Sequence, residues 1–267
     1  MISPQECDIV RNIAIDAGER ALKHFNNRNN INIDGKTGHD FVTEADLEVE
    51  KFLSDRLTEA FPNDGILGEE GASRPSSSGR IWIIDPIDGT TNFACGSDKW
   101  GISIGCFDSI RKKPKFGAVN FPAQGKLLLG GEDIAPTING IPLEKLRPVG
   151  LKAMIVGLGL GVGPDDRAIT LYKTINNAAG LLNRNFACGT ASLSEVVEGK
   201  LDGYVSIAES SWDVMGMLAI MEAQGGVSNV DWHKVDLHKK FSVVCGHREL
   251  VKYVAGFVSP HQSSSAF

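Results

Sequence analysis

Apolar residues near the start of the chain recur with the spacing of one helix face. One such stripe consists of Ile9, Ile13, Ala17 and Ala21. Residues 3–6 precede it and form a capping box with proline at the first helical position. A second stripe consists of Val49, Phe52, Leu53, Leu57 and Ala60. The pattern therefore predicts two helices, each with one buried face.

The pattern then changes to short runs that are typical of β-strands. Residues 81–84 are apolar and predict a buried strand, and Pro86 is expected to turn the chain out of the sheet because proline has no N–H for the ladder. Across residues 101–143, further β-like runs alternate with turns, and Asn139-Gly140 is a strong hairpin signal. For this half of the chain, the pattern predicts an antiparallel sheet flanked by the two helices.

After Pro148 the pattern changes again, to predicted strands that alternate with predicted helices. The predicted elements are a strand at 154–158, helices at 165–180 and 190–199, a strand at 203–207 and a helix at 214–224. The last helix is expected to bury one face, formed by Val214, Met217, Leu218 and Met221. Alternation of this kind indicates an α/β layer whose sheet is covered on both faces. The chain thus divides into halves at residues 1–147 and 148–267, with two layers of sheet in a mixed α and β fold.

Acidic residues gather at the ends of these predicted elements. Residues 68–70 place two glutamates after a short apolar run, and Asp85 and Asp88 flank the turn at the end of the next strand. Crowded carboxylates repel each other unless a cation compensates them. Oxygen ligands favour Mg²⁺ over softer metals. The alternative is that the two aspartates cap turns, while Asp213 is stabilised by the dipole at the start of its helix.

The order and spacing of these segments resemble the inositol monophosphatase family. Residues 68–70, 85–93 and 212–214 match its motifs, and residues 40–46 are similar to its D-x-V-T-x-x-D. The resemblance extends to SuhB-type proteins and covers nearly the whole chain. It implies the layered α-β-α-β-α sugar-phosphatase fold and a Mg²⁺-dependent, Li⁺-sensitive phosphatase with its metal site between the halves.

The resemblance also implies a set of site residues. Its metal ligands are the carboxylates of Glu69, Asp85, Asp88 and Asp213 and the carbonyl of Ile87, with Asp85 bridging two ions. Two or three ions would activate water to hydrolyse a phosphomonoester.

Catalysis is assigned by resemblance to Glu69, Thr90 and Asp46. Thr90 would orient the attacking water and pass its proton toward Asp46, while Glu70 would support the ligands from outside. For Asp46, together with Thr43, helix capping is the alternative role.

The predicted substrate contacts are Asp88, Gly89, Thr90, Gly189, Thr190, Ala191, Ser206 and Asp213. Backbone N–H groups at Gly89 and Thr90 would hold the phosphate at a helix start. Relatives that handle inositol carry a glutamate where this chain has Ser206, so inositol specificity is not implied. Glu209 either replaces that carboxylate or is an exposed loop acid. Histidinol phosphate, a 3′-nucleotide and fructose bisphosphate are alternative substrates to a small polyol or sugar phosphate.

Charge limits the partners of the chain. Its net charge is -6 and its pI about 5.6, which argues against a nucleic-acid surface spread over the whole molecule. The basic cluster at residues 111–115 is expected to be a solvated hairpin loop. A SuhB-like regulatory role, with RNA polymerase or RNA-processing machinery as partner, is the alternative from another functional class. The resemblance implies a homodimer.

The five cysteines are Cys7, Cys95, Cys106, Cys188 and Cys245. They are odd in number and lack C-x-x-C spacing, which argues against a disulfide framework and a zinc site. The start of the chain does not read as a signal peptide, and no apolar run has the length to span a bilayer. We therefore expect a cytoplasmic protein without a membrane segment.

Overall fold

The computed structural model describes residues 1–27, 33–37, 40–146, 154–161, 166–178 and 180–255. Its α-helices are α1 (Pro4–Asn26), α2 (Glu44–Ala60), α3 (Thr90–Cys95), α4 (Asp166–Lys173), α5 (Gly189–Val197), α6 (Ser211–Ala223) and α7 (Arg248–Ala255). A 3₁₀ turn at Pro122–Gln124 and a π-helical turn at Thr174–Ala178 complete the helical segments in this part of the chain.

Two mixed sheets form the framework. In spatial order, the eight-stranded sheet contains β10 (Ile141–Pro142), β9 (Ile134–Ile138), β8 (Lys126–Gly131), β7 (Lys113–Phe121), β6 (Gly101–Asp108), β5 (Arg80–Asp88), β3 (Gly65–Gly68) and β4 (Ser73–Arg74). The five-stranded sheet contains β12 (Leu182–Arg184), β11 (Ile155–Gly159), β13 (Gly203–Glu209), β15 (Phe241–Gly246) and β14 (Val227–Ser228). The hairpin β1 (Ile33–Thr37) and β2 (Asp40–Thr43) stands apart from both.

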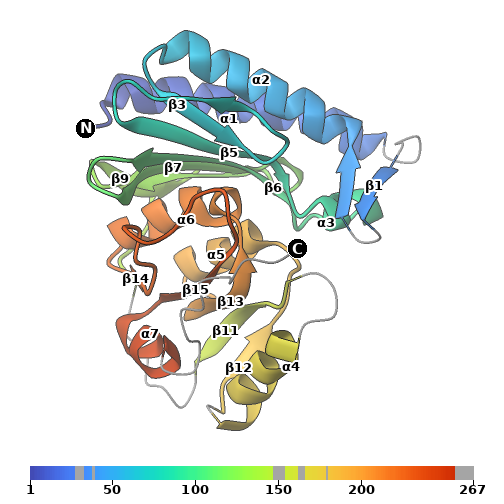
Figure 1. Cartoon of the computed structure of the whole chain (residues 1–267), viewed down its shortest axis with the longest axis vertical. Helices are drawn as coiled ribbons and strands as arrows, with labels where there is room; N and C mark the ends of the chain where they lie inside the picture. Colours follow the sequence, from blue (N-terminus) through green and yellow to red (C-terminus); the bar gives the residue numbers. More distant parts are fainter. Residues whose placement is uncertain (28–32, 38–39, 147–153, 162–165, 179, 256–267) are drawn as a thin grey trace.

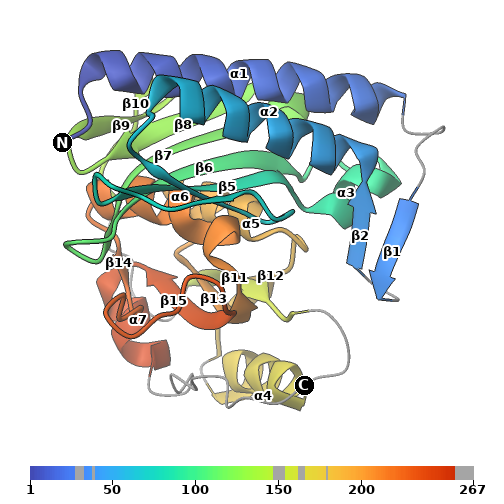
Figure 2. The same ribbon diagram turned by 45° about the horizontal axis from the view of Figure 1, so that its top comes forward.

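These elements stack in five layers (Figure 1). α1 and α2 run side by side across the outer face of the large sheet, as Figure 2 shows, and α5 and α6 lie between the two sheets. α4 and α7 cover the outer face of the small sheet, where they share a core with β11, β13 and β15. The predicted α-β-α-β-α architecture is confirmed.

The N-terminal helices form as their apolar spacing predicts. Ser3 and Glu6 make the expected capping box at the start of α1, with Pro4 in the first turn. The predicted stripe is wrong at one position, because Ile9 is exposed while Cys7 and Val10 are buried. The buried face is rotated toward these residues because α1 packs against α2 as well as the sheet.

Pro86 does not end its strand, contrary to expectation. β5 continues to Asp88, and its pairing with β6 shifts between Asp85 and Asp88. A bulge of this kind accommodates a proline, which has no N–H to donate, and re-aims the side chains around it. The chain then reaches Gly89, whose φ of 87° is left-handed, and α3 begins at Thr90 as the sequence predicts.

The basic cluster is only partly a loop. Arg111 and Lys113 both contact the Glu132 carboxylate, and Lys113 already belongs to β7. Lys115 is buried and lies 3.8 Å from Asp133. The prediction of a fully solvated loop is therefore wrong, because strand β7 begins inside the cluster.

α6 is buried on all sides rather than on one face. Its residues Val214 to Met221 are all buried, since the large sheet lies on one side of the helix and the small sheet on the other. The proposed division near residue 147 falls within 147–153, outside the described residues, and stays a prediction. No described helix combines the length and apolar composition needed to cross a membrane.

Candidate active site and metal centre

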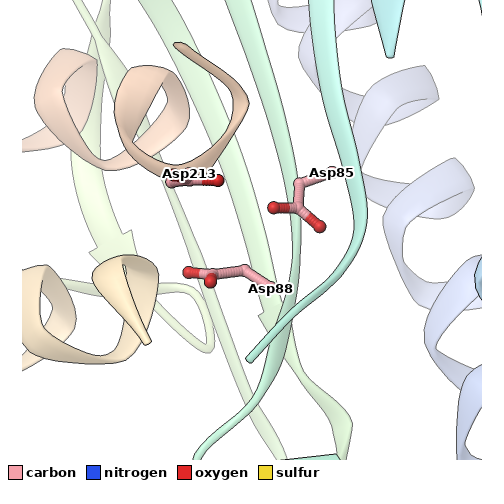
Figure 3. Close-up of side chains that lie close together, drawn as sticks. All are labelled: Asp85, Asp88 and Asp213. Carbon is pink, nitrogen blue, oxygen red and sulfur yellow. The ribbon is translucent and has the colours of Figure 1, made fainter. Parts of the chain in front are cut away.

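Three carboxylates from distant parts of the sequence meet between the two sheets. Asp85 lies on β5, Asp88 follows the bulge on the same strand, and Asp213 lies in the first turn of α6. Each offers one oxygen, and these oxygens all lie within 4.8 Å of one another. Figure 3 shows the three side chains converging on one space. Such a set of oxygen donors suits a hard divalent cation.

Backbone N–H groups fix each of the three acids. The Ile87 N–H donates to Asp85 Oδ1 at 3.0 Å, so the bulge itself orients this carboxylate. The Ser210 N–H donates to Asp213 Oδ2 at 2.8 Å as half of a capping box. Because an ionised carboxylate can accept at about four positions, each acid retains acceptor capacity for a cation.

Asp88 is held by the start of α5. The Thr190 N–H donates to Asp88 Oδ2 at 2.5 Å, and the Cys188 thiol lies 3.2 Å from the same oxygen. Cys188 is the N-cap of α5, and its sulfur also accepts the Ala191 N–H at 3.2 Å. The thiol is buried, and burial raises its pKa well above the usual range. Cys188 is thus a capping residue that links α5 to Asp88, a role that the sequence pattern did not reveal.

Glu69 lies beside this cluster at the end of β3. Burial and the charge of Glu70 raise the pKa of Glu69 to about 8, and a hydrogen bond with Asp85 opposes the shift. Glu69 is not one of the three acids whose oxygens all lie within 4.8 Å of one another. Because Glu69 hydrogen-bonds with Asp85, it lies at the border of the cluster on the side of Asp85.

The same physics acts on the other acids. Burial, and then the charge of Glu69, raises the pKa of Asp85 well above its usual range. Burial and the charge of Glu209 raise the pKa of Asp213. For Asp88, burial raises the pKa although hydrogen bonds from Thr190 favour the charged form. A cation in this space would relieve the repulsion, so the donor set fits a divalent metal ion.

These shifts predict how the metal-free protein responds to pH. The Glu69 pKa rises from an ordinary 4.5 to about 8 on folding. In that window the folded protein holds more protons than the unfolded chain, so its free energy of unfolding falls as the pH rises. Thermal unfolding in EDTA should show midpoints that decrease from pH 5 toward pH 8. Added Mg²⁺ should flatten this dependence, and equal slopes with and without Mg²⁺ would contradict a metal centre here.

The predicted relay residues lie close together. The Thr90 hydroxyl is 3.5 Å from Asp46 Oδ1 and 3.1 Å from the Ile87 carbonyl oxygen. Asp46 is buried in the first turn of α2. Gly89, which precedes Thr90, packs closely against the start of α5, because a Cβ there would lie 3.2 Å from the Cys188 sulfur. The side chain of Thr43, the other capping candidate, lies outside the described residues.

The residues predicted to bind substrate occupy two different settings. Gly189, Thr190 and Ala191 form the first turn of α5 and are buried. The Thr190 hydroxyl donates to the Asp213 carbonyl at 2.8 Å, so this residue ties two of the acids together. Gly89 and Thr90 are half-buried at the start of α3.

Ser206 is fully buried beneath Glu209. The Tyr204 hydroxyl donates to Glu209 Oε1 at 2.6 Å, and the Ser206 hydroxyl also hydrogen-bonds this carboxyl. The pairing of β13 with β15 shifts between Ser206 and Glu209. The Glu209 side chain therefore reaches Tyr204 and Ser206 of the same strand. Its Oε2 would lie 2.9 Å from a Cβ at Gly189, beside the start of α5. Glu209 is thus a buried acid next to the cluster and not an exposed loop acid.

Comparison with known proteins agrees with this architecture. The model of the inositol monophosphatase family matches residues 5–262. The chain belongs to this family.

Three curated relatives cover most of the chain. The inositol-1-monophosphatase of Bacillus subtilis is 28% identical over 246 residues, 90% of this chain and 91% of its own. The Nus factor SuhB of Pseudomonas aeruginosa is 26% identical over 264 residues, 95% and 96% of the two chains. The histidinol-phosphatase of Chlorobaculum parvum is 30% identical over 221 residues, 80% and 81%.

A solved structure shows the same fold. The extragenic suppressor protein SuhB of Bartonella henselae superposes with a TM-score of 0.83 at 21% identity, covering 94% of this chain and 97% of that one. Membership of the inositol monophosphatase family identifies the chain as an enzyme, a phosphatase of the metal-dependent kind. The three convergent aspartates form a cluster that could hold a metal ion.

Proposed function

We propose that the chain is a Mg²⁺-dependent phosphomonoesterase that acts on a small phosphorylated polyol or sugar. The convergence of Asp85, Asp88 and Asp213 within 4.8 Å carries this proposal, because oxygen-only donors suit Mg²⁺. Glu69 and the carbonyl of Ile87 would complete the ligand set. When bound, Mg²⁺ would offset the charge of the phosphate and acidify a water molecule.

The residues around the cluster would position the reactants. The Thr90 hydroxyl, which lies between Asp46 and the Ile87 carbonyl, would orient the attacking water and pass its proton toward Asp46. The backbone N–H groups of Gly89 and Thr90 would bind the phosphate oxygens. Thr190 would act by holding the two aspartates in place. Its N–H already donates to the Asp88 carboxylate, and its hydroxyl already donates to the Asp213 carbonyl.

A phosphate-release assay tests the function. The substrates would be inositol 1-phosphate, glycerol 2-phosphate, histidinol phosphate, a 3′-nucleotide and fructose 1,6-bisphosphate, each assayed with Mg²⁺ and with EDTA. We expect turnover of at least one of them with Mg²⁺ and none with EDTA. Turnover that persists in EDTA, or no turnover of any of them, would overturn the proposal. Lithium inhibition and a homodimer remain predictions from the family, and a cytoplasmic location remains a prediction from the sequence.

We further propose that Glu209 faces the alcohol part of the substrate in place of a carboxylate at Ser206. It is buried beside Gly189 and Asp213, and Tyr204 and Ser206 hold it there. A carboxylate accepts hydrogen bonds from hydroxyls, whereas the Ser206 hydroxyl is shielded beneath it.

Replacing this acid should change substrate preference. Glu209→Gln removes a charged acceptor worth about 1.5 kcal/mol or more, so kcat/KM for a polyol phosphate should fall roughly tenfold. The value for p-nitrophenyl phosphate, which has no hydroxyl, should fall much less. The measurement is the ratio of kcat/KM for the polyol phosphate to kcat/KM for p-nitrophenyl phosphate, in the wild type and in the variant. This ratio controls for folding, because a smaller folded fraction lowers both values equally. An unchanged ratio would remove Glu209 from the substrate site.

A regulatory role is the alternative from another class, since one relative is named a Nus factor. The basic cluster gives it little support, because Arg111 and Lys113 are engaged by Glu132 and Lys115 is buried. Salt-sensitive binding of RNA or RNA polymerase that survives Asp85→Asn would favour it.

A further inference from the structure

Glu50 is a buried carboxylate that the proposed chemistry does not use. It lies on α2 one helical turn after Asp46 and is only 4% exposed. Both of its oxygens accept backbone hydrogen bonds from one turn. The Glu70 N–H donates to Oε2 at 2.7 Å, and the Ala72 N–H donates to Oε1 at 2.8 Å. Burying a carboxylate costs free energy, and these two charge-assisted hydrogen bonds offset part of that cost.

The turn that Glu50 binds carries Glu69. It joins β3 to β4 and is closed by the Gly68 N–H, which donates to the Ala72 carbonyl at 2.7 Å. The Glu69 N–H donates to the Ile84 carbonyl at 3.3 Å and so continues the parallel pairing of β3 with β5. The conformation of this turn therefore decides where the Glu69 side chain points.

Glu50 also explains the glycine at the start of this turn. A Cβ at Gly68 would lie 2.5 Å from Glu50 Oε2 and 2.7 Å from its carboxyl carbon. Any side chain at this position would push Glu50 away from the two N–H groups. The glycine is thus required by the approach of the carboxylate, and not by a left-handed backbone.

We propose that Glu50 is a positioning residue for the metal centre, which holds the turn at residues 68–72 so that Glu69 is kept beside Asp85. The proposal rests on the proposed metal-dependent function. Asp85 and its neighbours repel a charged Glu69, so a turn free to relax would move this acid away from them. The two hydrogen bonds that Glu50 accepts from the turn resist that movement. Outer partners of metal ligands act on affinity in this way.

The test is a comparison of Glu50→Gln with Glu48→Gln. Glutamine keeps the shape of Glu50 but turns an NH₂ group toward one of the two N–H groups. Glu48 lies on the same helix, where its half-exposed side chain pairs with His24, so Glu48→Gln is a matched control. Thermal unfolding of each full-length protein would be followed while MgCl₂ is titrated. The Mg²⁺ concentration that gives half of the maximal stabilisation is the readout.

We expect this concentration to rise about tenfold in Glu50→Gln, as loss of one net hydrogen bond implies, and to stay unchanged in Glu48→Gln. The activity at saturating Mg²⁺ should recover to near the wild-type value. Should Glu50→Gln fail to fold, Glu50→Asp, which is one methylene too short to reach the turn, should show the same direction of change.

Two results would overturn the proposal, and they differ. A lower midpoint without metal, combined with an unchanged Mg²⁺ concentration for half stabilisation, would mean that Glu50 supports the fold alone. A wild-type protein that Mg²⁺ does not stabilise would instead contradict the proposed metal centre itself.

Discussion

Replacing Asp85 by asparagine should abolish phosphate release and leave the protein folded. The variant loses the carboxylate that hydrogen-bonds with Glu69 and converges with the other two aspartates. Loss of an outer partner of a metal ligand already costs about 10–100-fold, so loss of this ligand should lower kcat/KM by more than about 100-fold. The metal-free variant should also unfold at a higher temperature than the metal-free wild type, because one of several mutually repelling acids is gone.

The measurements are phosphate release and thermal unfolding, each with Mg²⁺ and with EDTA. Asp55→Asn is a suitable control, since Asp55 is exposed on α2 and pairs with Lys51 at the surface. The control should behave like wild type in both assays. Near-normal turnover by Asp85→Asn would refute the assignment of this aspartate to the metal.

The largest effect on stability should come from Asp64→Ala, away from the three aspartates. Asp64 is 2% exposed and receives the Trp82 indole N–H at 2.9 Å and the Ser78 hydroxyl at 2.6 Å. Arg80 pairs with the same carboxylate at 2.9 Å. Removing this carboxylate leaves the buried Trp82 indole N–H without its acceptor, whereas Arg80 keeps its pair with Glu6, so the free energy of unfolding should fall by about 3 kcal/mol.

Urea denaturation in the presence of Mg²⁺ would measure this loss. In contrast, Asp55→Ala breaks only a surface pair and should cost less than about 1 kcal/mol. A similar small cost for Asp64→Ala would show that this network contributes little. The surviving folded fraction of Asp64→Ala should keep its turnover rate, because Asp64 precedes the start of β3, whereas Glu69 follows the end of that strand.

Elements set by local spacing could be predicted from the sequence. The helix starts at Pro4 and Thr90 and the hairpin at Asn139-Gly140 depend on residues that are neighbours in the chain, and the structure has all three. The convergence of Asp85, Asp88 and Asp213 is also present, and the role of these aspartates as metal ligands remains a proposal.

Features that depend on contacts between distant segments could not be predicted in this way. The bulge at Pro86 is set by pairing with β6, and the link from Cys188 to Asp88 joins residues 100 apart in the sequence. Glu50 could have been singled out from the sequence, because it is an acid between the apolar positions Val49 and Leu53, which the helix buries. An acid inside an apolar stripe indicates a specific acceptor role, although its partners appear only in the fold.

The burial of α6 on all sides bears on how the molecule holds together as a unit. By sequence this helix belongs to the second half, yet it packs against β5, β6, β7 and β8 of the first. Either half by itself would leave a wide apolar surface exposed to water. The two halves are therefore expected to fold and unfold cooperatively, as one transition. Since Asp213 begins this helix, its meeting with Asp85 and Asp88 depends on that docking, and the metal centre becomes a reporter of completed folding.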